Sequence, residues 1–145
     1  MPAPVARVKS QFFDRRAVVE AIGRTRAAVL SKVGAFVRQR ARSSMRRRKA
    51  VAAAGGPPSA HAGNLKDLLF FALDPEAKSV VVGPVPFVKG EAPHLLEFGG
   101  TVQRGTPGGR TRTARYHGNP FMAPALQAEA EAGTLTDVWA NSLRP

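Results

Sequence analysis

The chain has 145 residues, and 43% of them are hydrophobic, so its composition favours one folded domain with a single core over a disordered chain. It contains no cysteine, which excludes disulfides, thiol catalysis and cysteine-ligated zinc. No apolar run approaches eighteen residues and the N-terminus lacks the apolar stretch of a secretory signal, so we expect neither a membrane partner nor secretion.

Positive charge is concentrated in the first third of the chain. The net charge is +12, and residues 1–50 hold 14 Lys and Arg against only Asp14 and Glu20. Residues 51–145 hold 8 basic and 8 acidic residues, so their net charge is zero. A localised excess of this kind predicts contact with a polyanion, with an acidic protein surface, or with both.

A long helix is the main predicted element of this basic third. We expect residues 1–12 to form an arm and residues 13–50 to form one helix, with Asp14 as its N-cap. The first half carries apolar residues at helical spacing and is expected to pack on the core. The second half is expected to project from it. The apolar positions of the first half are Val18, Ile22, Val29, Val33, Phe36 and Val37.

The projecting half of this helix is the predicted partner-binding element. Seven of its twelve residues from Arg38 to Lys49 are basic and none is acidic, which suits phosphate groups or an acidic protein; a solvated helix end is the alternative. No aromatic residues lie between the arginines and no base-reading pattern is present, so we expect no sequence-specific recognition of nucleic acid. The predicted contacts to a partner or to DNA are Arg38, Arg40, Arg42, Arg46, Arg47, Arg48 and Lys49.

A linker and a hairpin follow the helix. Gly55, Gly56, Pro57 and Pro58 end any helix, so we predict a linker over residues 51–63. Beyond it, the pattern favours a strand over residues 65–73, turn residues over 74–78, and a β-branched strand over 79–84. These two strands are expected to pair as a hairpin.

The last third mixes loops with short elements. We predict a short ordered element over residues 94–98, a mobile loop over 99–115, a strand over 115–123 and a final helix over 124–142. Gly133 weakens the middle of that helix. Its expected inner face consists of Leu126, Leu135, Val138 and Trp139.

Together these elements predict an α+β fold. A long N-terminal helix and a C-terminal helix pack on a small antiparallel β-sheet. We expect one domain, in which residues 64–145 contribute the sheet and the C-terminal helix.

The sequence shows no pattern typical of an active site. His94 and Glu97 are spaced i, i+3, as in some metal sites, but no second pair accompanies them, and surface histidines are the alternative for His61, His94 and His117. No nucleophile turn is present, and the glycine-rich stretch 105–110 lacks the lysine of a phosphate-binding loop. We therefore predict no enzymatic activity, no metal and no cofactor.

Four short motifs occur in order along residues 56–126. They are Gly56-Pro57-Pro58 with His61-Ala62-Gly63-Asn64-Leu65, then Asp74-Pro75 with Ser79-Val80-Val81-Val82-Gly83-Pro84, then Leu96-Glu97-Phe98-Gly99-Gly100, and last Asn119-Pro120-Phe121-Met122-Ala123-Pro124-Ala125-Leu126. Their order and spacing resemble the tail-completion, or head–tail joining, proteins of tailed bacteriophages. The resemblance covers about residues 15–142. This chain departs from the family's usual residues at Gly100, where Thr is common, and at Asn119, where Arg is common.

The motif residues have expected structural roles. Gly63 starts the first strand ahead of Leu65, and Gly83 with Pro84 ends the second. Glu97, next to Gly99, accepts backbone N–H bonds in a tight turn. Pro120 and Pro124 frame Phe121 and Met122, which are expected to fill the core where the final helix begins.

The resemblance implies a structural virion protein. Such subunits form a ring, expected here to be hexameric, that joins the head connector to the tail tube around the DNA channel. Expected partners are other copies of the chain, the connector, adaptor or stopper protein, the tail tube or tail terminator protein, and channel DNA. The expected location is the virion neck, after assembly in the host cytoplasm. The alternative function is a basic nucleic-acid-binding protein.

The loop over residues 99–115 gains a role from the same resemblance. We expect it to become ordered between neighbouring subunits. Its basic residues are Arg104, Arg110, Arg112 and Arg115.

Overall fold

A computed structural model describes residues 14–60, 64–85 and 92–142, and it has the predicted α+β fold. Two pairs of strands are separated by one short helix, and two helices stand at each end of the order. The elements are α1 (Arg15–Ser44), α2 (Asn64–Asp67), β1 (Leu69–Asp74), β2 (Ser79–Pro84), α3 (Ala92–Phe98), β3 (Gly100–Gly105), β4 (Thr111–Tyr116), α4 (Met122–Glu131) and α5 (Thr134–Ser142).

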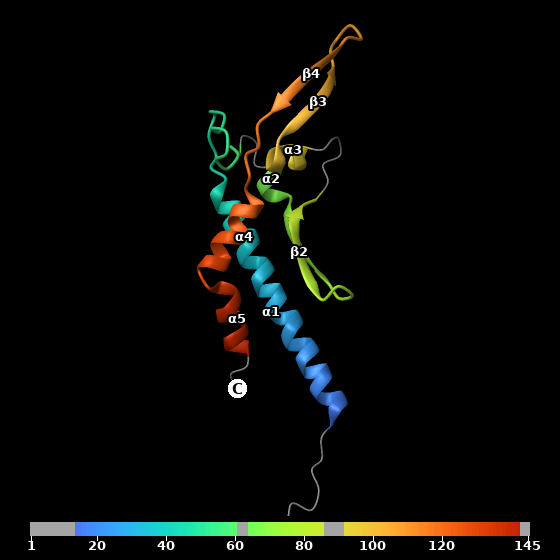
Figure 1. The fold of residues 1–145 in the computed structure, drawn as a ribbon, viewed down its shortest axis with the longest axis vertical. Coiled ribbons are helices and arrows are strands. Elements are labelled where there is room, and N and C mark those ends of the chain that lie inside the picture. Colours follow the sequence, from blue (N-terminus) through green and yellow to red (C-terminus); the bar gives the residue numbers. More distant parts are fainter. Residues whose placement is uncertain (1–13, 61–63, 86–91, 143–145) are drawn as a thin grey trace, which may run out of the picture.

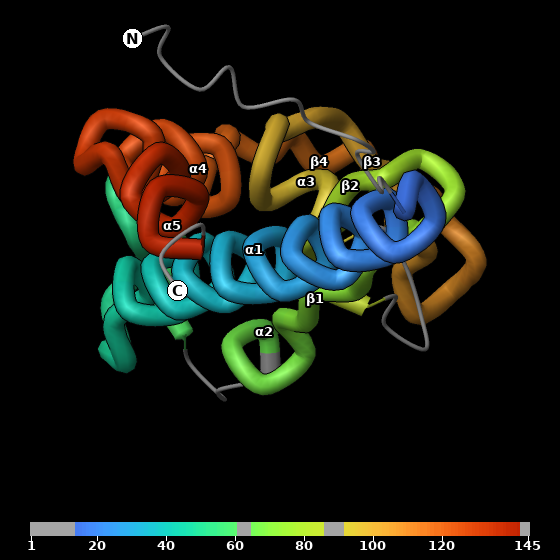
Figure 2. The backbone as a smooth tube through the Cα atoms, turned by 90° about the horizontal axis from the view of Figure 1, so that it is seen from below, coloured from blue at the N-terminus to red at the C-terminus, as the bar shows by residue number. Residues whose placement is uncertain are grey.

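Helix α1 is the axis of the molecule (Figure 1). Helices α4 and α5 run along one side of it, and the β1–β2 hairpin runs along another. The start of α1 lies at one end of the molecule, and the β3–β4 hairpin extends from the other end. The view turned by 90° shows α4, α3 and β2 above α1, and β1 and α2 below it (Figure 2). Both flanks therefore pack on a single helix.

Two separate hairpins replace the single small sheet that the sequence predicts. Strands β1 and β2 pair antiparallel from Leu69 opposite Pro84 to Asp74 opposite Ser79. Strands β3 and β4 form a second two-stranded sheet, from Gly100 opposite Tyr116 to Gly105 opposite Thr111. The predicted first hairpin is confirmed, although residues 64–67 form a helical turn before its first strand.

The prediction of a loop over residues 99–115 is wrong, because these residues form β3 and β4. Thr106 closes their connection by donating from both its backbone N–H and its hydroxyl to the carbonyl of Arg110. Gly108 and Gly109 supply the positive φ angles of the turn. The composition of the segment is that of a loop, but its threonines and valine suit strands.

Helix α1 is shorter than predicted. Asp14 caps it as expected, with its carboxylate accepting from the Ala17 N–H at 3.0 Å, but the helix ends at Ser44 rather than near residue 50. Ser43 and Ser44 turn their hydroxyls onto carbonyls one turn earlier, and Lys66 donates to the Met45 carbonyl at 2.9 Å. Competing side-chain bonds and a tertiary contact thus end the helix without a glycine or proline.

The core lies on the middle and the end of α1, so the prediction is right in part. Val29 and Val37 are buried as expected, but Val18, Ile22 and Phe36 are exposed, and the part predicted to project carries the buried residues Ala41 and Met45. The buried positions of this helix are Val29, Gly34, Val37 and Ala41, and Met45 follows them into the core. Every residue from 14 to 22 is exposed. Beyond Val37 the apolar signal is limited to Ala41 and Met45 among basic residues, although these two residues belong to the same core cluster as Leu69, Phe121 and Ala125.

The C-terminal helix is two helices. Gly133 has φ of 73° and separates α4 from α5. The predicted inner face is wrong in part, because Leu126 and Trp139 are exposed and the buried residues of α4 are Ala125 and Glu129. A single helix over residues 124–142 would keep one face inward along its length, whereas the break at Gly133 reorients the second half.

Residues 117–121 and 51–60 have no regular structure, so the predicted strand over 115–123 ends at Tyr116. The segment 51–60 is held against the body: Pro58 and Ala60 are buried, and the Ala60 N–H donates to the Arg46 carbonyl. The arm over residues 1–12 and the expected roles of His61 and Gly63 lie outside the described residues.

Candidate assembly interface

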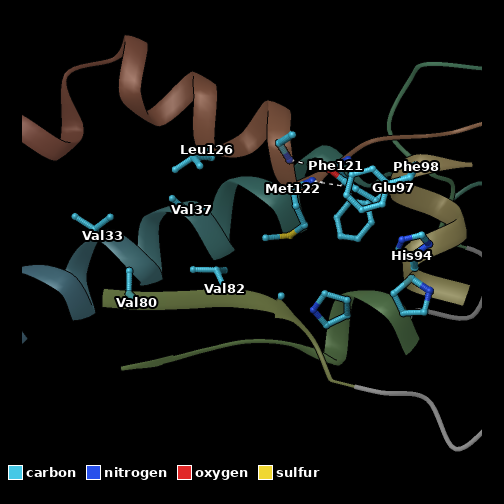
Figure 3. Close-up of a pocket in the computed structure, with 14 residues that line it drawn as sticks. Val33, Val37, Val80, Val82, His94, Glu97, Phe98, Phe121, Met122 and Leu126 are labelled. Atoms are coloured by element: carbon cyan, nitrogen blue, oxygen red, sulfur yellow. Dashed lines mark hydrogen bonds between the residues drawn. The ribbon is translucent and has the colours of Figure 1, made fainter. Parts of the chain in front are cut away.

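An apolar groove runs along α1 between its two flanks (Figure 3). Val33 and Val37 of α1 line it, and Val80 and Val82 of β2 form one wall. Met122 and Leu126 of α4 form the opposite wall, and the groove has a volume of about 520 Å³. We call this feature the α1–α4 groove.

Helix α3 closes one end of the α1–α4 groove with Glu97. The Glu97 carboxylate accepts the backbone N–H groups of Phe121, Met122 and Ala123, at 2.8, 3.0 and 2.9 Å. The first N–H groups of a helix have no partner within it, and α4 has no side-chain cap of its own, so Glu97 supplies that cap from another helix. The predicted acceptor role of Glu97 is confirmed, but its donors lie at the start of α4.

Two glycines allow the chain to pass close to α3. Gly99 has φ of 73°, and its N–H donates to the Leu95 carbonyl at 2.8 Å, which ends α3 with a left-handed residue. A Cβ on Gly99 would lie 2.8 Å from the backbone nitrogen of Gly118. The glycine of this motif is therefore required by conformation and by space.

Asn119 ties the segment 51–60 to the same region. Its side-chain amide donates to the carbonyls of Ala53 and Gly56, at 2.6 and 2.8 Å, and its backbone N–H donates to Leu96. Phe121, two residues later, is 1% exposed, so the expected core role of Phe121 is confirmed; Met122 is only partly buried. These bonds position the end of the groove.

Three of the arginines predicted to contact a partner are engaged within the chain. Arg38 donates to the Leu69 carbonyl, and its guanidinium carbon lies 5.6 Å from the centre of the Phe70 ring. Arg40 pairs with Glu129, and Arg42 lies 3.6 Å from Asp67. These contacts fix α1 to β1, α4 and α2, so the three arginines have a structural role in addition to any contact outside the chain.

Glu129 is the buried partner in this set. It is 5% exposed, and its second carboxylate oxygen accepts from the Thr134 hydroxyl at 2.6 Å. The Thr134 hydrogen bond, and then that of Arg40, hold the pKa of Glu129 below its ordinary value, and the positive charge of Arg40 acts in the same direction against the effect of burial. The pair joins α1 to α4 and α5.

The rest of the basic run remains on the surface. Arg46, Arg47, Arg48 and Lys49 are all exposed and follow the end of α1 without helical structure. Arg48 donates to the Ser59 hydroxyl at 2.9 Å. These four residues, which we call the 46–49 cluster, keep their charge available for a partner.

A second basic surface lies on the β3–β4 hairpin. Arg104 stands directly opposite Arg112 in the register, and Arg104 also lies over the Tyr116 ring at 5.4 Å. Like charges opposite each other destabilise a strand pair, and residues 99–116 contain no acid to offset them. All four predicted loop residues, Arg104, Arg110, Arg112 and Arg115, are exposed on this hairpin.

Much apolar surface is left uncovered. Among the described residues, eight hydrophobic residues are buried and twelve large hydrophobic side chains are exposed. Phe98, which lines the groove, is 73% exposed, and its ring lies tilted against that of His94 with ring centres 4.9 Å apart. Exposed apolar side chains mark a contact site where they form one contiguous patch.

The described residues contain no group of three His, Asp or Glu side chains that could hold a metal ion. Within residues 14–60, 64–85 and 92–142, no helix is both long enough and apolar enough to cross a bilayer. Glu97 and His94, spaced for a possible metal site, have other contacts: a helix N-terminus and the Phe98 ring.

Comparisons with protein-family models, with curated proteins and with solved structures return no match.

The sequence did not predict the roles of Gly34 and Glu129 or the α1–α4 groove. The spacing of Val33 and Val37 on one helix face was visible, but the position of β2 and α4 on either side of that face depends on contacts distant in sequence.

Proposed function

We propose that this chain is a structural subunit of a tailed-phage neck, which assembles as a ring, expected to be hexameric, between the head connector and the tail tube. The order of the four motifs is the first support for this proposal. The observation that carries it furthest is the small core beside extensive exposed apolar surface, since neighbouring subunits would cover that surface.

The motif residues also support a shared architecture. Glu97, Gly99 and Phe121 belong to the motifs on which the resemblance rests, and they join α3 to the start of α4 through a cap, a close backbone approach and a buried ring. These are roles that keep a fold, as expected for a subunit without a catalytic site.

In this proposal the two exposed basic surfaces meet different neighbours. The 46–49 cluster docks on channel DNA or on an acidic face of the connector. The β3–β4 hairpin extends from the body and lies against an adjacent subunit, where acidic groups would relieve the repulsion between Arg104 and Arg112.

The direct test is an averaged electron micrograph of the virion neck that resolves the copy number and neighbours of this chain. A protein that stays outside purified virions would contradict the proposal.

Replacing the basic residues by neutral ones then tests which partner each basic surface contacts. Changing Arg46, Arg47, Arg48 and Lys49 together to Gln removes four charges at one surface, and the matched variant changes Arg104, Arg110, Arg112 and Arg115 to Gln. If the 46–49 cluster docks on protein, its variant yields unjoined heads and tails. If it docks on DNA, particles join but retain less genome, measured by packaged DNA per particle. Normal joining and normal retention with both variants would contradict docking by either surface.

Nucleic-acid binding is the second candidate, and the acid-free arginine hairpin favours it. A protein that binds free DNA through phosphates loses affinity steeply as salt rises, with a log–log slope of about −0.9 per phosphate contact. Absence of binding to duplex and single-stranded DNA at about 50 mM salt would eliminate this candidate.

A further inference from the structure

Within the described residues, the first turns of α1 expose aliphatic side chains. Residues 14–22 are all exposed, and three of them are aliphatic: Val18, Val19 and Ile22 are 39, 60 and 57% exposed. Gly23 and residues after it line a pocket with the turn of the β1–β2 hairpin, and in Figure 1 the start of α1 extends past both that hairpin and the end of α5. We call residues 14–22 the N-terminal helix segment.

The α1–α4 groove is the complementary surface. It is open, its walls are aliphatic, and it runs along a helix between a strand and another helix. Grooves of this type accept an amphipathic helix through apolar residues at i, i+3 and i+4. Val18, Val19 and Ile22 have that spacing, since Ile22 follows Val18 by four residues and Val19 by three.

The N-terminal helix segment cannot enter the groove of its own chain. Val33 of the same helix lines the groove, and Ile22 precedes it by eleven residues, which places it about 16 Å away along the helix axis. Folding the segment back would break a continuous thirty-residue helix. An occupant of this kind must come from another copy.

Charge favours the same pairing. Helices α4 and α5, on one side of the groove, carry exposed Glu131 and Asp137, and residues 117–142 contain no Lys or Arg. Residues 14–26 at the start of α1 hold four arginines against Asp14 and Glu20, a net charge of +2, although Arg16 pairs with Glu20. A basic helix would therefore approach an acidic wall.

We infer that the N-terminal helix segment of one copy docks in the α1–α4 groove of the next copy. The two surfaces are different parts of the chain, so the contact is head-to-tail, and repeated contacts of this type close into a ring or continue as a filament. This inference rests on the proposed ring function, because it names the contact that would join neighbouring subunits of the ring.

Engineered disulfides test the contact, because the natural chain has no cysteine. The variant carries Ile22→Cys together with Leu126→Cys, two exposed positions at the opposite sides of the proposed contact. Mild oxidation of the full chain should give a ladder of covalent oligomers on a non-reducing gel, whereas each single variant can give dimers at most. The matched control replaces Ile22→Cys with Arg24→Cys, which lies about 200° around the helix.

The expected rates separate docking from collision. At about 10 µM protein, docked cysteines at an effective concentration of about 1 mM should cross-link about 100-fold faster than free ones. A ladder with the Ile22 pair, and little with the Arg24 pair, supports the contact. Equal ladders from the two pairs overturn it, because random collision would explain both.

Sedimentation of the natural chain distinguishes the remaining outcomes. Oligomers without a ladder overturn this contact but leave the ring function standing on another interface. A chain that stays monomeric at high concentration, both alone and with neck proteins, and gives no ladder, overturns the contact and the ring function together.

Discussion

Glu97 is a single residue that joins two helices, and its effect on stability is measurable. Its carboxylate is the cap of α4, with three N–H donors within 3.0 Å. Replacement by Gln keeps the shape but removes the charge and one acceptor oxygen. We expect Glu97→Gln to lower the free energy of unfolding by about 1–2 kcal/mol, measured by urea denaturation.

The control for Glu97 is Glu131→Gln on the same helix that Glu97 caps. Glu131 is exposed and accepts only from the Gln127 side chain, so its replacement should change the free energy of unfolding by less than about 0.5 kcal/mol. Equal losses from the two variants would show that Glu97 contributes charge alone and not a cap.

Glu129 should make stability depend on pH. Because its pKa in the folded protein lies below the unfolded-state value of 4.5, its stabilising effect is complete above that value and is lost as the pH falls through the folded-state pKa. At neutral pH we expect Glu129→Gln to cost about 1–3 kcal/mol, since Arg40 and Thr134 lose a charged partner.

The natural chain and the Glu129→Gln variant should therefore become more similar in their free energy of unfolding as the pH is lowered from about 6 to about 3. Urea denaturation at each pH measures it, and other carboxyl groups cancel because both chains share them. A difference that stays constant over this range would show that the ionised form of Glu129 is not the stabilising one.

At the scale of elements, the packing of α1 on the β1–β2 hairpin depends on Gly34. A Cβ at this position would lie 2.7 Å from a methyl carbon of Val80 and 2.9 Å from the Phe71 ring. Alanine at an exposed helix position is more favourable than glycine by about 1 kcal/mol. The clash should exceed that gain, since overpacking costs about 1–3 kcal/mol.

Gly23 of the same helix is the matched control, because a Cβ there meets no atom within 4 Å. We expect Gly34→Ala to lower the melting temperature and Gly23→Ala to raise it, measured by circular dichroism. A rise in both variants would contradict the close contact between α1 and the hairpin.

The stability of the β3–β4 hairpin depends on contacts outside the hairpin. An isolated two-stranded hairpin is marginally stable in water, and this one holds Arg104 opposite Arg112. Its base is held at Gly99 and Gly118, while its tip is exposed. In the proposed ring, a neighbour or DNA would complete its stabilisation.

At the scale of the whole molecule, apolar surfaces lie at separate places. The N-terminal helix segment extends from one end, and the α1–α4 groove lies beside the middle of the same helix. A compact monomer would bury such surfaces against each other. Here the straight axis of α1 keeps them apart, and in the proposed ring neighbouring copies would cover them.

The sequence by itself determined the elements whose signals are local. The cap at Asp14 and the strand of β-branched residues after the turn at residues 74–78 depend on neighbours a few residues away. The α+β class, the acceptor role of Glu97 and the core position of Phe121 were also predicted.

Only the tertiary structure decided which part of the long helix is buried. Periodicity places apolar residues on one face, but it does not say whether a partner covers that face. Val18 and Ile22 belong to the same predicted stripe as Val37, yet they are exposed. Val37 and Ala41 are buried, because β1, β2 and α4 pack on that part of the helix. The arginines of that part bind the Leu69 carbonyl, Glu129 and Asp67. Contacts between residues distant in sequence therefore determine which part of the helix is buried, and no local sequence pattern encodes those contacts.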